Sequence, residues 1–335
     1  LCYFMLFLSY LWRFASYSVF SKCFLPPPSI FFIMVEGDRV NTAFIAAGGS
    51  KKIKGQPKAF IDVGGKPSVE HVVDAVLGSG IENVYVWTNE RTRLENILKG
   101  KQGNIHVVEA QKKVVDSVLS TYFQYLNSNF EEFDDFKGDW RKWENVRDYI
   151  DHNKPLIEVP VLYTSGDAPL IQSNEIGKFI DEFDTQNKDF MIGFTRRDKV
   201  DERLADLSLY EEFYGLKSTI NSFVYLKEDP VRINNLHVVK PLKVEAELYK
   251  IIQGLYNFRK FSSPRNWPKI IGLIRDFKAG KKKGLMGDAV KLIYSAYKSQ
   301  SNKSYKSINK YSKKLEIPHI ESILEDFTGL RFKFN

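Results

Sequence analysis

Cysteine is almost absent from this 335-residue sequence. Its two cysteines, Cys2 and Cys23, both lie in the first 33 residues. The body of the chain can therefore form neither a disulfide bond nor a cysteine-based metal site. This composition suits a reducing compartment, and we expect a cytoplasmic protein. The hydrophobic content of 43% argues against global disorder and is enough for one large domain or two smaller ones.

Acidic residues are missing from residues 1–33, which hold many aromatics, three consecutive prolines and only two bases, Arg13 and Lys22. The apolar run Leu1–Trp12 is shorter than the roughly 20 residues that a helix needs to cross a bilayer. No basic residue precedes that run, as one would in a secretory signal. We interpret residues 1–33 as a non-core segment, either upstream sequence read in frame or a membrane or targeting segment. We expect the protein to fold without it.

Two common phosphate-binding patterns are missing as well. A P-loop places Gly-Lys-Ser/Thr four residues after its first glycine, whereas Gly55 is followed by Gln56 and Pro57. A dinucleotide fingerprint requires GxGxxG after a strand, and the chain has none there. Any phosphate-binding site in this chain must therefore use another pattern.

One stretch, Ala43–Ser68, supplies such a pattern. The apolar run Thr42–Ala47 has the length of a buried strand and leads into Gly48 and Gly49. Three lysines follow within four residues, and then comes the pair Pro57-Lys58. Adjacent glycines let the backbone approach a bulky ligand and point N–H groups at it, and lysines just beyond them suit a polyphosphate. The alternative is an ordinary strand-to-helix turn with a solvated lysine cluster.

We expect the apolar segment Glu158–Ser165 to be a strand. The second pattern, Gly166-Asp167-Ala168-Pro169, follows it directly. A carboxylate at the carboxyl end of a central parallel strand points into the crevice where such sheets bind ligands. Mg²⁺ prefers oxygen ligands and bridges one or two carboxylates to phosphates. Asp167 is therefore the best candidate for a magnesium ligand, the alternative being a plain turn in which Asp bonds its own backbone.

Together, in this order, the two patterns resemble those of the MobA-like nucleotidyltransferases, which include molybdenum-cofactor guanylyltransferase and the sugar-phosphate nucleotidyltransferases. The resemblance covers roughly residues 42–195. This sequence has lysine where the family usually has arginine, and lysine lacks the planar fork that grips a phosphate with two hydrogen bonds. The matching parts are Ala46-Ala47-Gly48-Gly49, Lys52, Pro57-Lys58, Gly65-Lys66-Pro67 and the Gly166–Pro169 turn.

The resemblance implies roles for individual residues. Lys58 and Lys52 would be catalytic, and Asp167 and Asn235 would hold the metal. Asp116 and Ser117 match positions that contact the base or the substrate in relatives, although a solvated helix start explains these two residues equally well. The implied nucleotide-binding residues are Ala46, Ala47, Gly48, Gly49, Lys51, Lys58 and Ser117.

Alternating strand and helix patterns after Val40 favour a mainly parallel sheet covered by helices on both faces. With the resemblance, this predicts a three-layer α/β/α Rossmann-like fold of nucleotide-diphospho-sugar transferase type, with a mixed sheet. We expect a nucleotidyltransferase domain over residues 34–240, with an acidic and aromatic insertion over residues 130–149. Arg232–Val239 looks like a loop leading into a further strand.

Residues 241–335 carry a net charge of +12, against +8 for the whole chain, and turn helical in pattern. We predict a basic helical C-terminal subdomain that closes the substrate side. The segment contains no recognised nucleic-acid module, so no specific nucleic-acid partner is expected, and a weak contact with an anionic membrane is the alternative use. The expected helices are Val244–Leu255, Trp267–Ala279, Gly287–Tyr297 and Ile320–Phe327.

The resemblance therefore implies an enzyme that transfers an NMP from an NTP to a phosphorylated small-molecule acceptor, with Mg²⁺, and releases pyrophosphate. One alternative is a non-catalytic nucleotide sensor or scaffold on the same fold with an anionic partner. A related glycosyltransferase would want Asp-x-Asp, but Gly166-Asp167-Ala168 supplies one carboxylate. The sequence specifies neither the acceptor, nor the NTP, nor the oligomeric state.

Overall fold

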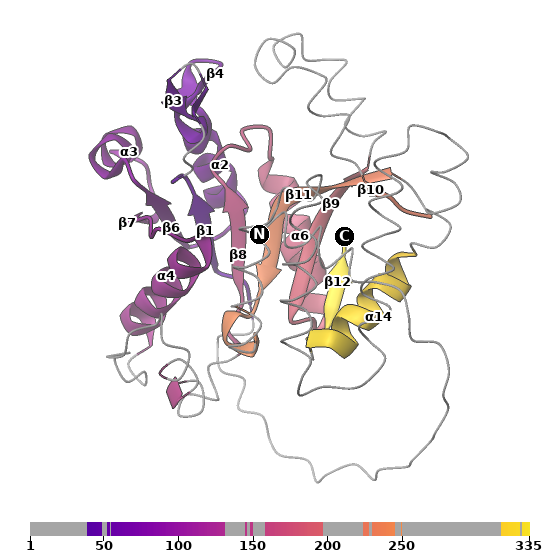
Figure 1. The fold of residues 1–335 in the computed structure, drawn as a ribbon. Coiled ribbons are helices and arrows are strands. Elements are labelled where there is room, and N and C mark those ends of the chain that lie inside the picture. The colour runs from indigo at the N-terminus through magenta and orange to yellow at the C-terminus, as the bar shows by residue number, and fades with distance from the viewer. Residues whose placement is uncertain are drawn as a thin grey trace, which may run out of the picture.

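A mixed β-sheet forms the centre of the molecule (Figure 1). The computed structural model describes residues 39–48, 52–53, 55–130, 145, 148–149, 158–196, 224–227, 230–244, 249, 316–328 and 330–335. Seven strands run side by side in the order β12-β9-β11-β8-β1-β6-β7, and β10 pairs with β11 outside this row. The strands are β1 (Thr42–Ala46), β6 (Asn83–Thr88), β7 (Asn104–Glu109), β8 (Val161–Ser165), β9 (Phe190–Arg196), β10 (Val224–Tyr225), β11 (Pro230–Val239) and β12 (Phe332–Phe334).

Most neighbouring strands are parallel, as the sequence predicts. β1 runs parallel to both β6 and β8, and β6 runs parallel to β7. β11 is antiparallel to β8 and to β9, so β8 and β9 point the same way. The carboxyl ends of β1, β6 and β8 therefore meet at one edge of the sheet, where open α/β sheets bind ligands.

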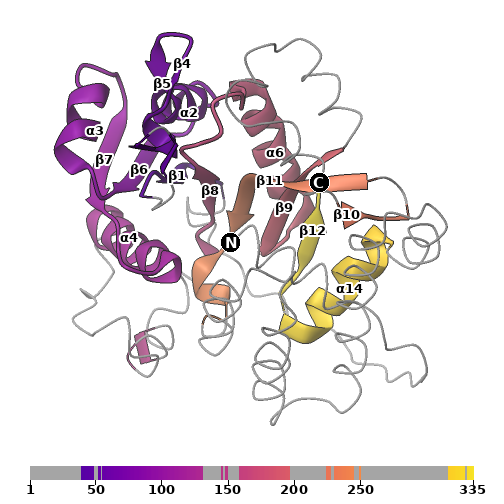
Figure 2. The same ribbon diagram turned by 45° about the horizontal axis from the view of Figure 1, so that its top comes forward.

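Different side chains fill the two faces of the sheet. Alternate residues of β1 point to opposite faces. Ala43 and Ile45 belong to an aliphatic core that also contains buried residues of α2 (Ser68–Leu77), α3 (Arg91–Leu98) and α6 (Ser173–Gln186). On this face α2 and α6 lie side by side (Figure 2).

The opposite face is aromatic. Phe44 of β1 packs edge-on against Tyr85 and Trp87 of β6. It also meets Tyr122 of α4 (Val114–Asn129), which covers this side. Tyr122 donates a hydrogen bond of 2.9 Å to the Val159 carbonyl oxygen, so its buried hydroxyl group is satisfied.

The two strands expected at residues 42–47 and 158–165 are present as β1 and β8, and both are somewhat shorter than expected. The helix α4 begins at Val114, because the Gln111 N–H group donates to the Ser117 hydroxyl group (2.8 Å) and lies in the turn before the helix. The interpretation of residues 232–239 as a loop leading into a strand is wrong, since this whole segment belongs to β11. A register shift between Ile233 and His237 interrupts the ladder with β9, which explains the irregular sequence pattern.

The end of the chain joins the sheet. The expected last helix is confirmed as α14 (Ile317–Thr328), and the unexpected β12 pairs in parallel with β9. The Asn335 N–H group donates to the Ile192 carbonyl oxygen at 2.9 Å. The boundary at residue 240 stays a prediction. Most of the expected helix Val244–Leu255, the whole of Trp267–Ala279 and Gly287–Tyr297, and most of the insertion at residues 130–149 lie outside the described residues.

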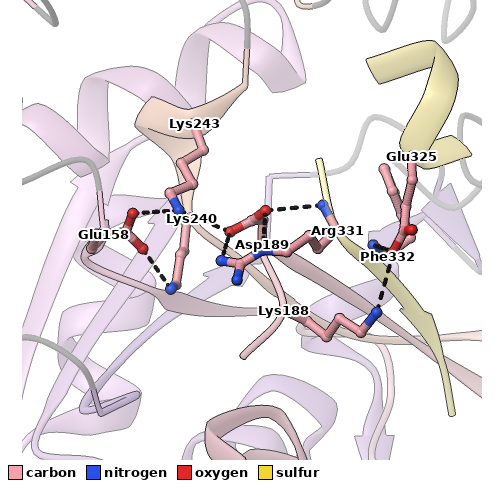
Figure 3. A network of polar contacts seen from close by, with 8 residues as sticks. All are labelled: Glu158, Lys188, Asp189, Lys240, Lys243, Glu325, Arg331 and Phe332. Atoms are coloured by element: carbon pink, nitrogen blue, oxygen red, sulfur yellow. Dashed lines mark hydrogen bonds and ion pairs between the residues drawn. The ribbon is translucent and has the colours of Figure 1, made fainter. Parts of the chain in front are cut away.

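A network of charges fixes β12 and η4 (Pro241–Lys243) to the amino ends of β8 and β9 (Figure 3). Asp189 accepts two hydrogen bonds from the Arg331 guanidinium group, at 2.7 and 3.0 Å, and lies 3.0 Å from the Lys243 Nζ atom. Glu158 accepts from Lys240 at 2.8 Å and also pairs with Lys243. Although burial acts against it, this set of cations lowers the pKa of Asp189 to about 2.

No helix in the described part of the chain is long and apolar enough to cross a membrane.

Candidate active site

Asp167 lies just beyond the carboxyl end of β8, in a tightly fixed turn. The Gly166 N–H group donates to the Ala46 carbonyl oxygen at 2.9 Å, and the Ser68 hydroxyl group donates to the Gly166 carbonyl oxygen at 2.9 Å. The Ser165 hydroxyl group donates to one carboxylate oxygen of Asp167. The turn is thus attached to β1 and to the start of α2, which holds the Asp167 carboxylate in a defined place.

Lys58 approaches the same carboxylate from a distant part of the sequence. It opens the short 3₁₀ helix η2 (Lys58–Phe60), and its Nζ atom lies 3.6 Å from Oδ2 of Asp167. The Lys58 and Asp167 side chains are 33% and 26% exposed. The structure therefore brings together Lys58, which is expected to be catalytic, and Asp167, which is expected to bind the metal, at a place that solvent can reach.

We call residues 48–58, which follow β1 and end at Lys58, the basic loop. Its first residue is Gly48, and crowding by a neighbouring residue explains why this position has no side chain. A Cβ atom at this position would lie 2.7 Å from Cβ of Ala110, which follows β7. The Gly48 carbonyl oxygen accepts a hydrogen bond of 3.1 Å from the Asn89 side chain. Ala46 and Ala47 lie beside the turn of Asp167, whereas Gly49 and Lys51 lie outside the described residues.

Two short hairpins frame Lys58. β2 (Lys52–Ile53) pairs with β3 (Gln56–Pro57), which places the backbone of Lys52 directly opposite Pro57. β4 (Asp62–Val63) pairs with β5 (Lys66–Pro67) through Gly64 and Gly65. Both glycines have positive φ angles, of 64° and 89°, as a two-residue hairpin turn requires. Lys52 and Lys58 thus belong to one compact unit at this edge of the sheet.

Asn235 lies in the bulged part of β11. β11 pairs His237 with Tyr163 of the antiparallel strand β8, and two residues before His237 the chain reaches Asn235. Asn235 is therefore at the same end of the sheet as Ser165. Its neighbour Asn234 accepts a hydrogen bond from the Leu236 N–H group at 2.9 Å and fills the space that a side chain at Gly193 would need.

Ser117 lies elsewhere, buried at 2% exposure in the first turns of α4. Its hydroxyl oxygen accepts the hydrogen bond from the Gln111 N–H group and lies 3.4 Å from the Lys113 carbonyl oxygen. These contacts shape the turn between β7 and α4. A direct contact of Ser117 with a nucleotide stays a prediction.

The residues at this edge suit a hard cation. Asp167 offers carboxylate oxygens and Asn235 an amide oxygen, the ligand types that Mg²⁺ prefers. Among the described residues, no group of three or more His, Cys, Asp or Glu side chains could hold a metal ion by itself. Such a site would need oxygens from the substrate or from water, which is how Mg²⁺ is normally bound beside phosphates.

The described histidines near this region have structural roles. The His71 ring lies 2.7 Å from the Val63 carbonyl oxygen and ties α2 to the β4–β5 hairpin. His237 is fully buried and stacks on Tyr163, and burial lowers its pKa to about 3, so the ring stays neutral. The sequence had also given no sign of Asn89 and Arg93, whose contacts with the basic loop become visible only when the strands are placed side by side.

Comparison with protein families gives one match, to the model described as the MobA-like NTP transferase domain, over residues 43–217. This span exceeds half of the chain and contains both Lys58 and Asp167. The family consists of nucleotidyltransferase enzymes that typically depend on a metal ion. The comparison with curated proteins gave no match.

Solved structures to which the chain is similar include 4-diphosphocytidyl-2C-methyl-D-erythritol synthase from Anaerococcus prevotii (16% identity, TM-score 0.37, 73% of this chain and 85% of that one). Another is CMP:2-keto-3-deoxy-manno-octonic acid synthetase with CTP (11%, TM-score 0.37, 72% and 86%). A third is Rv0371c from Mycobacterium tuberculosis (12%, TM-score 0.30, 46% and 65%), which has also been solved with manganese. At these identities and TM-scores, the likenesses say nothing about the substrate.

Proposed function

The chain belongs to the MobA-like NTP transferase domain family, and we propose that it transfers an NMP from an NTP to a phosphorylated small-molecule acceptor. NTP binding is implied by the family, whereas the acceptor class is our inference. An oxygen of the acceptor's phosphate attacks the α-phosphorus, the bond between that phosphorus and the bridging oxygen of the β-phosphate breaks, and pyrophosphate leaves.

The contact between Lys58 and Asp167 carries this proposal. It joins a cation from the basic loop to a carboxylate at the carboxyl end of a central strand, with Nζ and Oδ2 3.6 Å apart. Charge develops on phosphate oxygens during nucleotidyl transfer, and a fixed ammonium group stabilises it. Lys58 is therefore assigned to the α-phosphate, with Lys52, Lys51 and the backbone of Gly48 and Gly49 around the remaining phosphates.

The proposed metal is Mg²⁺, held by Asp167 and Asn235. When bound, it would neutralise phosphate charge and orient the phosphate for in-line attack. The protein's own residues then position the reactants. A phosphate acceptor loses its second proton near pH 6, so at neutral pH its attacking oxygen needs no general base. The reaction therefore needs no histidine as a general base, which agrees with the structural roles of His71 and His237.

A pyrophosphate-release assay tests the proposed function. The four NTPs are first screened for Mg²⁺-dependent thermal stabilisation of the protein, and the best of them is then combined with phosphorylated acceptors and with their dephosphorylated forms. We expect release only with a phosphorylated acceptor. Lys58→Ala should lower kcat by about a hundredfold or more, as on loss of one charge-stabilising donor, with a smaller effect on NTP affinity. The matched control is Lys178→Ala, at an exposed position on α6.

The alternative function, a nucleotide sensor or scaffold, rests on the same loop. A sensor would bind the NTP with the same dependence on Lys58 but would release no pyrophosphate with any acceptor. That outcome would contradict the proposed transferase while leaving the nucleotide site in place. A cytoplasmic location also stays a proposal.

A further inference from the structure

A short segment after β6 contacts the basic loop at both of its ends. At the start of the loop, Nδ2 of Asn89 donates to the Gly48 carbonyl oxygen at 3.1 Å. At its end, Nη2 of Arg93 donates to Oε1 of Gln56 at 3.0 Å. The two contacts come from residues only four positions apart. We call Asn89 and Arg93, with these contacts, the clamp.

Arg93 also lies over the ring of Phe60, with its Cζ atom 4.6 Å from the ring centroid. Gln56 and Phe60 stand two residues before and two residues after Lys58. One guanidinium group therefore touches the chain on both sides of the lysine. A guanidinium group can stack on a ring and donate a directed hydrogen bond at the same time, which suits arginine better than lysine for this position.

The clamp is anchored in the core. Leu94, next to Arg93, is fully buried in the aliphatic core, together with Leu98 one turn later. Before the helix, the Glu90 N–H group donates to the Thr88 hydroxyl group at 3.0 Å, which fixes the turn out of β6. The sheet thus fixes the position of Arg93, and the contacts of its guanidinium group with Gln56 and Phe60 restrain the loop.

Electrostatics distinguishes Arg93 from Arg91 on the same helix. Arg91 pairs with Glu95 at 2.8 Å. Within the described residues, Arg93 has no carboxylate at ion-pair distance, and its contacts are a neutral amide and a ring. The positive charge of Arg93 is therefore added to that of the basic loop, against which the phosphates of the proposed substrate would lie.

We propose that Arg93 is a positioning residue for nucleotidyl transfer: together with Asn89 it clamps the basic loop, so that Lys58 stays in register with Asp167. The proposal rests on the proposed function for its effect on the reaction. The clamp itself is a property of the protein before any ligand binds, and it can be measured independently.

Hydrogen exchange of the nucleotide-free full chain measures the clamp directly. We expect Arg93→Met to raise the amide exchange rates of residues 52–60 by about tenfold, because a hydrogen bond to a charged group is lost there. Arg91→Met removes the same charge from the same helix without touching the loop, and it should leave these rates unchanged. Unchanged exchange in Arg93→Met, or equal increases in both variants, would overturn the proposal.

Turnover then shows whether the clamp acts through Lys58. We expect Arg93→Met to lower kcat about tenfold, with a melting temperature equal to that of Arg91→Met. In a Lys58→Ala background, Arg93→Met should lower kcat no further, because the residue that it positions is gone. A full additional tenfold loss there would contradict positioning through Lys58. A wild-type protein without transferase activity would refute the proposed function, while the exchange result would still decide on the clamp.

Discussion

Two groups of charged side chains lie at opposite ends of the same strands and are built in opposite ways. At the amino ends of β8 and β9, the Asp189 side chain is 5% exposed and contacts two cations, Arg331 and Lys243 (Figure 3). At the carboxyl end of β8, Asp167 is 26% exposed. Among the described residues, its contacts are one lysine and one hydroxyl group.

The difference separates a charge that holds the fold together from a charge that can bind a ligand. The Asp189 carboxylate accepts three hydrogen bonds from Arg331, one of them from the backbone, which leaves little room for another partner. Asp167 is held in place by its backbone, through the attachment of Gly166 to β1 and α2, and its carboxylate remains accessible. A rigid backbone and an open side chain together provide the preorganisation that catalysis requires.

Neutralising each of the two carboxylates in turn tests this difference most directly. We expect Asp167→Asn to abolish Mg²⁺-dependent pyrophosphate release, a loss of at least about a hundredfold in kcat, while the melting temperature changes little, since the side chain is partly solvated. The measurements are pyrophosphate release across a Mg²⁺ titration and a thermal melt. If the variant keeps normal Mg²⁺-dependent activity, the metal is held elsewhere.

Asp189→Asn should have the opposite profile. The pKa of Asp189 is about 2 in the folded protein against 3.8 for the free side chain, so its charge contributes about 2 kcal/mol to the free energy of unfolding. We expect that loss at pH 7 in a denaturant titration, with kcat unchanged at temperatures where the variant is folded. A large fall in kcat without a change in stability would remove the distinction between the two ends.

The pH dependence of stability refines the same prediction. Because the folded pKa of Asp189 is lowered, its contribution is fully present above about pH 4 and disappears as the pH falls toward about 2. The difference in unfolding free energy between the wild type and Asp189→Asn should therefore shrink over this interval. A difference that stays constant between pH 5 and pH 2 would show that Asp189 stabilises the fold by something other than its charge.

Local patterns were enough to predict the parallel half of the sheet. The strands β1 and β8 lie within a few residues of their expected bounds, because strands buried on both faces read as near-continuous apolar runs. The pairing of Lys58 with Asp167 could be inferred only through the family resemblance. Nothing in the spacing of two residues 109 positions apart indicates a contact of 3.6 Å.

The features that the sequence patterns predicted wrongly or not at all have physical causes. The broken pattern of residues 232–239 favours a loop over part of their length, whereas the break is a bulge in which Asn234 folds over Gly193 on the neighbouring strand. β12 has three residues, and its partner β9 lies more than a hundred residues earlier in the chain. The contacts of Asn89 and Arg93 with the loop depend on which strands are neighbours. In each case a long-range contact decided the outcome, and local propensity does not encode it.

The smallest predicted effect concerns Gly48, whose lack of a Cβ atom has two candidate causes: crowding by Ala110 and the close approach of a ligand. In Gly48→Ala the new Cβ atom would lie 2.7 Å from Cβ of Ala110, so we expect a loss of about 1 kcal/mol in the free energy of unfolding. Adding Ala110→Gly removes the opposing atom and should restore stability, as measured by denaturant titration. NTP affinity then separates the two causes: because the described clash involves only Ala110, we expect the double variant to bind NTP as the wild type does. A double variant with restored stability and weakened NTP binding would show that the ligand requires the glycine in addition to the crowding by Ala110. That result would place Gly48 with Asp167 among the residues kept accessible for chemistry.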